Sequence, residues 1–207
     1  MDRAAATAAD EERFERALAR IDAIHAEDPE SEVAAGVSGP RELLYARHMT
    51  DMLRRFAPDA SEAVKLAVRC QHIRRWEIPR ASYPPTPAGY KAWRAQLLVR
   101  QAEVASGILR EAGYDADMIG RVAKLIRKEG IKRDDEAQLL EDVAALVFLE
   151  HYLADFAAAH RDYDEAKLLD ILRKTLRKMS AAGRSAALSL IDAPPAVAPL
   201  LQKAGRR

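Results

Sequence analysis

The sequence predicts an all-α fold, and three observations support this prediction. Glycine accounts for only 9 of the 207 residues, whereas alanine, leucine, arginine and glutamate, which favour helices, are abundant. Apolar residues recur at spacings of three and four, which is the period of a helix. No stretch alternates firmly between apolar and polar residues, as a half-exposed strand would. We therefore expect a single helical domain of about seven helices over residues 1–190, followed by a Pro/Ala-rich tail over 191–207.

Three helices are expected before residue 77. The first ends at the segment HAEDPE, and a loop with Gly36 and Gly39 leads to the second, in which Pro40 suits a first-turn position. Asp59 is a plausible N-cap for the third helix, which should run to about Trp76. The apolar stripes consist of Phe14, Leu18, Ile21 and Ile24 in the first helix and of Leu44, Tyr45, Met49, Met52 and Phe56 in the second.

Four more helices should follow an irregular stretch, EIPRASYPPTPAG. Its four prolines cannot all be accommodated in a helix, and an ordered loop of this length is often functional. The tail is expected to be ordered only in part. The four helices should run from about Tyr90 to Ala112 before Gly113, from there to Gly130, from Asp134 to about His160, and from Asp164 to about Ala182.

Composition limits the class of protein. Lys and Arg number 33 against 32 Asp and Glu, which argues against a general nucleic-acid binder. Cys70 is the single cysteine, so the chain can form neither an internal disulfide nor a thiolate zinc cluster. No apolar run approaches the roughly 18–20 residues that span a bilayer, and the N-terminus lacks the apolar region of a signal peptide. We therefore expect a cytoplasmic protein with no membrane partner.

Basic and aromatic residues gather around the proline-rich stretch. Arginine suits phosphate or carboxylate through paired donors, and aromatic rings can stack on a ligand. We interpret the segment as the wall of a pocket for a small anionic ligand. The alternative is that the arginines pair with Glu77, Glu103 and Glu141 while the aromatic rings hold the loop to the helices. The predicted ligand-binding residues are Arg74, Arg75, Arg80, Lys91, Arg94, Trp76 and Tyr83, with Tyr90 and Trp93 nearby.

Asp142 lies within an apolar stripe of its expected helix. A carboxylate there is costly unless it is paired, hydrogen-bonded or bound to a metal. The functional interpretation is a metal ligand or a general base, and the alternative is a buried aspartate paired with an arginine. The stripe around it consists of Leu139, Leu146, Leu149, Leu153 and Phe156.

Two histidines extend this hypothesis. His72 has apolar neighbours one turn away on either side, and His48 lies at the edge of its apolar stripe. With Asp142 they could hold one divalent ion, for which zinc, iron and manganese are all conceivable. The alternative is that both are core histidines with satisfied hydrogen bonds.

Several segments resemble known families. The run LAVRCQHI (66–73) resembles the His-Asp helix of the HD-domain superfamily, and LEDVAALVFLE (140–150) resembles its last motif. More narrowly, QHIRRWEIPRASYPPTPAGYKAWR and EDVAALVFLEHY are similar to the family catalogued as domain of unknown function 4202, over nearly the whole chain. The broader resemblance implies an HD-like fold in which His48, His72 and Asp142 are metal ligands.

The chain departs from the HD pattern at most other ligand positions. The His-Asp pair is replaced by Gln71 and His72, and the positions for a second ion hold Gln101 and Arg127 or Lys128. Amide oxygens are weak ligands and a cation repels a metal. A two-metal site is therefore not expected.

The sequence favours two functions. The first is a divergent HD-like, metal-assisted hydrolase of a small phosphorylated or nucleotide-like anion, with Asp142 and His72 as catalytic residues and arginines neutralising the substrate. The second is a metal-free module that binds an anionic metabolite or a partner protein through the same pocket.

Overall fold

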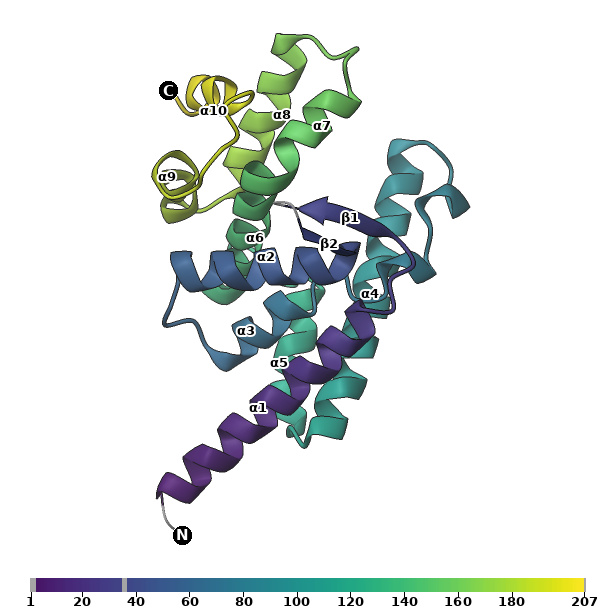
Figure 1. The fold of residues 1–207 in the computed structure, drawn as a ribbon, viewed down its shortest axis with the longest axis vertical. Coiled ribbons are helices and arrows are strands. Elements are labelled where there is room, and N and C mark those ends of the chain that lie inside the picture. Colours follow the sequence, from purple (N-terminus) through teal and green to yellow (C-terminus); the bar gives the residue numbers. More distant parts are fainter. Residues whose placement is uncertain (1–2, 35–36, 207) are drawn as a thin grey trace. The chain divides into compact units, whose positions relative to one another are not determined.

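The computed structural model describes residues 3–34 and 37–206 and is mostly helical (Figure 1). The chain divides into two compact units. The first unit comprises residues up to Thr50 together with Ala60–Glu129, and the second comprises Asp51–Asp59 and the residues from Gly130 onward. None of the described helices is long and apolar enough to cross a membrane.

The first unit is built around helices that pack on one another. Helix α4 packs against α1 and α5, and α3 packs against α1 and α5. Its elements are α1 (Arg3–His25), β1 (Ser31–Ala34), β2 (Val37–Pro40), the first part of α2 (Arg41–Phe56), α3 (Glu62–Arg69), α4 (Pro87–Ala112) and α5 (Ala116–Ile126). Fully buried side chains in its core include Ile21, Met49, Leu66, Leu109, Leu125 and Ile126.

A short hairpin corrects the prediction of a purely helical chain. Strands β1 and β2 pair antiparallel, with Ser31 opposite Pro40. Four residues per strand are too few for a visible alternation pattern, so the sequence did not reveal them. Pro40 ends the second strand directly before α2 instead of occupying its first turn, and Gly36 lies outside the described residues.

Helix α3 is shorter than predicted at both ends. Its N-cap is Ser61, whose hydroxyl accepts from the Val64 N–H at 3.3 Å, and not Asp59. It ends at Arg69, and the chain then turns through left-handed backbone at His72 (φ 64°) and Arg74 (φ 51°). The rest of the predicted helix is replaced by turns and a short 3-10 helix, Arg75–Glu77. A second 3-10 helix, Arg80–Ser82, lies within the proline-rich stretch.

The helices predicted after the proline-rich stretch are confirmed with revised boundaries. Gly113 ends α4 in a left-handed conformation (φ 94°), and Asp134 and Asp164 cap the helices that follow them. The helix predicted from Asp164 to Ala182 breaks because Ser180 caps a new helix. The second unit contains α6 (Asp135–Val147), a π-helical turn (Phe148–Tyr152), α7 (Leu153–Ala159), α8 (Glu165–Lys178), α9 (Ala181–Ser189) and α10 (Ala198–Gly205). Helix α10 lies in the predicted tail and packs against α8 and α9.

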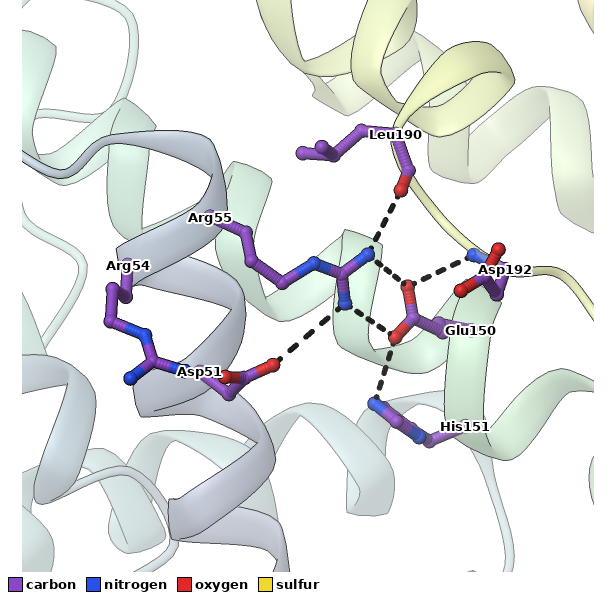
Figure 2. A network of polar contacts seen from close by, with 7 residues as sticks. All are labelled: Asp51, Arg54, Arg55, Glu150, His151, Leu190 and Asp192. Atoms are coloured by element: carbon purple, nitrogen blue, oxygen red, sulfur yellow. Dashed lines mark hydrogen bonds and ion pairs between the residues drawn. The ribbon is translucent and has the colours of Figure 1, made fainter.

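The π-helical turn carries a buried carboxylate, Glu150, at the centre of a polar network (Figure 2). Arg55 donates to both of its oxygens, at 2.7 and 3.2 Å, and to the Leu190 carbonyl at 2.9 Å. The Asp192 N–H and the His151 ring also contact the carboxylate, each at 3.2 Å. This network joins the end of α2 to the rest of the second unit.

Replacing the buried carboxylate should destabilise the protein. Glu150→Gln removes the charge that compensates Arg55, and we expect the free energy of unfolding to fall by about 2–3 kcal/mol. This is below the range for a fully buried pair, because the Arg55 side chain is 28% exposed. The matched control is Glu165→Gln, which breaks an exposed pair with Lys203 and should cost less than about 0.5 kcal/mol. Urea unfolding measures both, and equal losses would contradict a special role for Glu150.

Candidate functional site

The imidazole of His72 is hydrogen-bonded at both ring nitrogens. Nδ1 lies 3.1 Å from Glu42 Oε2, and Nε2 lies 3.0 Å from Arg75 Nη1. A guanidinium group only donates, so Nε2 must accept, and the ring proton must therefore be on Nδ1 and be donated to Glu42. The geometry thus sets both the tautomer and the charge state: His72 is a neutral imidazole.

Three features of the fold hold this ring in place. The left-handed backbone at residue 72 ends the helical path and redirects the side chain. The ring then stacks on Tyr45 of α2, with centroids 4.1 Å apart and planes 11° from parallel. Glu42, in the first turn of the same helix, is anchored by its N–H, which donates to Asp28 Oδ2 at 2.9 Å. A non-glycine residue in this conformation costs about 1–3 kcal/mol, and such residues cluster at functional sites.

Positive charge dominates the surroundings of His72. Burial, followed by the charges of Arg75, Arg94 and Lys128, holds the pKa of His72 well below its ordinary value of 6.5. The carboxyl of Glu42 compensates only in part. Burial raises its pKa to about 7, although the nearby Arg75 acts in the opposite direction. At neutral pH this carboxyl is therefore partly protonated, and the group as a whole carries excess positive charge.

Arg75 and Arg94 are placed differently within this group. The Arg75 guanidinium carbon lies 4.9 Å from the ring centroid of Trp93, whose indole N–H donates to the Ile78 carbonyl at 2.8 Å. Arg94 follows Trp93 on α4 and is half-buried. Among the residues that the structure describes, Arg94 has no hydrogen-bond or ion-pair partner. We call Glu42, Tyr45, His72, Arg75, Arg94 and Lys128 the His72 cluster.

Arg80 closes the proline-rich loop on itself. Its guanidinium donates to the carbonyls of Tyr83 and Pro84, both at 2.9 Å, and lies 5.9 Å from the Trp93 ring centroid. Tyr83 is half-buried beside it. These contacts agree with the alternative interpretation, in which the side chains of the proline-rich loop serve to hold this loop in place.

Arg74 forms ion pairs with two glutamates. Two other predicted binding residues, Trp76 and Lys91, take no part in the contacts described for the His72 cluster. Arg74 pairs with Glu77 at 2.6 Å and with Glu27 at 3.1 Å. Trp76 is half-buried in the first 3-10 turn, and Lys91 is exposed near the start of α4. Of the predicted binding residues, Arg75 and Arg94 are therefore the two that the structure brings to His72.

Asp142 is buried in the second unit, with 2% of its surface exposed, and its carboxylate contacts Ser180, the N-cap residue of α9. Oδ1 accepts from the Ser180 N–H at 2.9 Å and from Gln138 at 3.0 Å, and Oδ2 accepts from the Ser180 hydroxyl at 2.5 Å. That hydroxyl in turn accepts from the Gly183 N–H, at 2.9 Å, at the start of α9. Among the described residues, its partners are thus a hydroxyl and two N–H donors, and no arginine forms an ion pair with it.

The packing around this carboxylate leaves no space for a larger residue at position 183. A Cβ atom added to Gly183 would lie 2.6 Å from Asp142 Cγ, closer than real Cβ contacts. The glycine is therefore required by close approach, because the first turn of α9 lies directly against the Asp142 carboxylate.

Two of the three predicted metal ligands make other polar contacts in the structure. Both nitrogens of His72 are engaged, and the Asp142 carboxylate is bonded to Ser180. His48 is half-buried on α2. Within residues 3–34 and 37–206, no group of three or more His, Cys, Asp or Glu side chains could hold a metal ion. The one-ion site stays a prediction from the sequence.

Two members of the His72 cluster escaped the sequence analysis. Glu42 looks like an ordinary acidic residue in the first turn of a helix, a common position for it. Tyr45 was assigned to the apolar stripe, and only the stacked His72 ring distinguishes it. Neither residue carries a local signal that would have revealed its partner.

Comparison with known proteins identifies one similarity. Residues 15–201 match the model of a family described as Domain of unknown function (DUF4202). No curated protein and no solved structure matches the chain.

Glu42→Gln tests the raised pKa of the cluster's carboxyl. Folding raises this pKa from 4.5 to about 7, so between these values the folded state holds a proton that the unfolded chain has lost. The stability that the protonated carboxyl contributes is full below about pH 4.5 and is lost as the pH rises through 7. Glutamine still accepts from His72 but does not titrate. The variant should therefore gain stability relative to the wild type across this window, by up to about 1.4 kcal/mol per pH unit.

Urea unfolding at several pH values measures this difference. His72 acts in the opposite direction, because its lowered pKa makes stability rise with pH up to 6.5. His72 titrates in both the wild type and the variant, so the pH dependence of the stability difference between them reports on Glu42. Glu103→Gln, an exposed substitution on α4, is the control. A stability difference that does not change with pH would contradict the assignment.

Asp142→Ala tests whether the second buried carboxylate is structural. The substitution leaves the N–H and the hydroxyl of Ser180 without their acceptor, so unfolding should become easier by about 2–4 kcal/mol. Asp170→Ala, which breaks an exposed pair with Lys174 on α8, should change the stability little. We expect the same loss with or without added zinc, iron or manganese. Stoichiometric metal in the purified protein that disappears in both Asp142→Ala and His72→Ala would instead favour the one-ion site.

Proposed function

The chain belongs to the DUF4202 family, and we propose that it binds a small phosphorylated or similarly charged anion at the His72 cluster. The observation that carries this proposal is the convergence of Arg75, Arg94 and Lys128 on a neutral imidazole. The carboxyl in the cluster, Glu42, is itself partly protonated near neutral pH.

Electrostatics favours an anion in such a place. Like charges held close together repel, and the repulsion is stronger in partly buried surroundings than in water. An anion of charge one or two offsets it. Arginine adds specificity because its planar fork binds two oxygens of a phosphate or carboxylate at once.

The two arginines can contribute differently to binding. Arg94 has no other described partner to give up. Arg75 would exchange its bond to His72 for a charged acceptor, and the face of Trp93 would hold its guanidinium plane during the exchange. The partial exposure of both side chains allows a ligand to reach them.

The contact between Glu42 and His72 favours a second candidate function, phosphate-ester hydrolysis. A carboxylate that holds Nδ1–H orients the other nitrogen as a base. A bound ester would draw Arg75 to its oxygens and release Nε2. The imidazole could then take a proton from water as the water oxygen bonds to phosphorus. The bond from phosphorus to the alcohol oxygen breaks, and that oxygen receives the proton.

The metal-assisted hydrolase with an HD-like fold is a further form of this second candidate. It would use His48, His72 and Asp142 to hold zinc, iron or manganese. Its support is the resemblance of the sequence to the HD motifs alone, and it predicts a hydrolysis activity that depends on metal.

Calorimetric titration with inorganic phosphate and with AMP tests the anion site. Arg94→Gln should lower the affinity for both ligands roughly 10- to 100-fold, since a charge-assisted hydrogen bond contributes about 1.5–3 kcal/mol. Arg75→Gln should weaken them similarly. The matched control is Arg110→Gln, an exposed arginine about four turns further along α4. Affinity should also fall as ionic strength rises. Equal affinities in the wild type, Arg75→Gln and Arg94→Gln would rule out the cluster as the binding site.

Hydrolysis of p-nitrophenyl phosphate tests the second candidate. With a chelator present to remove metal ions, His72→Gln should abolish turnover, and Arg94→Gln should chiefly raise KM. Turnover in His72→Gln at the wild-type rate would discard general-base catalysis and leave the binding proposal intact. Activity that requires added zinc, iron or manganese and is lost in both His48→Ala and Asp142→Ala would support the metal-assisted form.

A further inference from the structure

A cavity of about 420 Å³ lies in the second unit among α8, α9 and α10. Three arginines line it: Arg173 and Arg177 from α8, and Arg184 from α9. The volume is within the range of sites that take a small molecule. No acidic side chain is among the described residues that line this cavity.

The sequence places two of these charges on the same face of one helix. Arg173 and Arg177 are four residues apart on α8, a spacing at which like charges repel. Arg184 is held by a hydrogen bond to the Met179 carbonyl at 2.7 Å. The fold thus concentrates three positive charges around one hollow.

The three arginines make few contacts with carboxylates in the part of the chain that the structure describes. None of the three forms an ion pair with a carboxylate there. Asp170, on the same helix, is bonded to Lys174 at 2.6 Å. The Nε of Arg173 is buried with no hydrogen-bond partner among the described atoms. A buried donor without an acceptor destabilises the folded state, and a bound anion would offset this cost.

The remaining wall of the cavity is apolar. Leu176 and Leu188 line it, and 39% of the surface of Leu188 is exposed, which is unusual for a large apolar side chain in this structure. A Cβ atom added to Gly205 would lie 2.9 Å from Leu188, so α10 packs tightly along that wall. A ligand that covers Leu188 would remove this apolar surface from water.

We propose that this cavity is a second binding site, for an organic anion that carries a short alkyl or aryl group on a phosphate or carboxylate. The anionic group contacts the three arginines, and the apolar group lies against Leu176 and Leu188. Its ligand differs from that of the His72 cluster, because an inorganic anion would contact the arginines and leave the apolar wall uncovered.

Titration of phenyl phosphate and octanoate into the Arg94→Gln protein tests the proposal, because that variant weakens the His72 cluster. Arg177→Gln is the main substitution, since Arg177 is exposed, has no described hydrogen bond and should leave folding intact. Arg177→Gln should lower the affinity for phenyl phosphate roughly tenfold or more. Lys174→Gln removes the same charge from the neighbouring surface of α8 and should leave the affinity unchanged.

Leu188→Ser tests the apolar wall. It should weaken phenyl phosphate and octanoate several-fold while leaving the weaker binding of inorganic phosphate unchanged. Failure of both organic anions to bind, or binding that neither Arg177→Gln nor Leu188→Ser alters, would overturn the second site. Loss of binding through Arg75→Gln, with Arg177→Gln silent, would assign these ligands to the His72 cluster instead.

Discussion

The hydrogen bond from Arg75 to His72 decides the chemistry of the first unit. Because a guanidinium group never gives up its protons at accessible pH, the nitrogen that faces it must accept. The other ring nitrogen must then carry the proton and donate it to Glu42. A single contact therefore fixes the tautomer, the neutral charge and the orientation of the imidazole. The stacked Tyr45 ring and the left-handed backbone at residue 72 also hold the imidazole in this position.

Charge in this protein is balanced over the chain but not within its sites. The formal net charge is only +1, and many surface arginines pair with nearby carboxylates. In the His72 cluster three cations act on one imidazole beside a partly protonated Glu42, and no carboxylate is among the described residues that line the cavity of the second unit. Repulsion of this kind lowers stability unless something offsets it. That cost is the physical basis for assigning both places to anions.

The buried carboxylates show how similar residues acquire different roles. Glu42 is partly protonated because burial outweighs its cationic neighbour. Glu150 has Arg55 on both oxygens, and Asp142 has a hydroxyl and a backbone N–H. Asp142 and Glu150 are satisfied by their surroundings and hold the second unit together. The pKa of Glu42 is raised to about 7, so its protonation can respond to a ligand near neutral pH.

The sequence by itself determined the helical class and most helix boundaries after residue 87, including the ends set by Gly113, Asp134 and Asp164. These depend on residues a few positions apart, where periodicity and capping act. It also drew attention to His72, Arg75 and Arg94, because basic and aromatic residues gather around the proline-rich stretch; their role in binding stays a prediction. Tertiary structure alone decided the hairpin, the early end of α3, and the partners of the buried polar groups. Glu42 and His72 are 30 positions apart, and Asp142 and Ser180 are 38 apart. No local rule relates residues at such distances, because only the packing of helices brings them within hydrogen-bonding range.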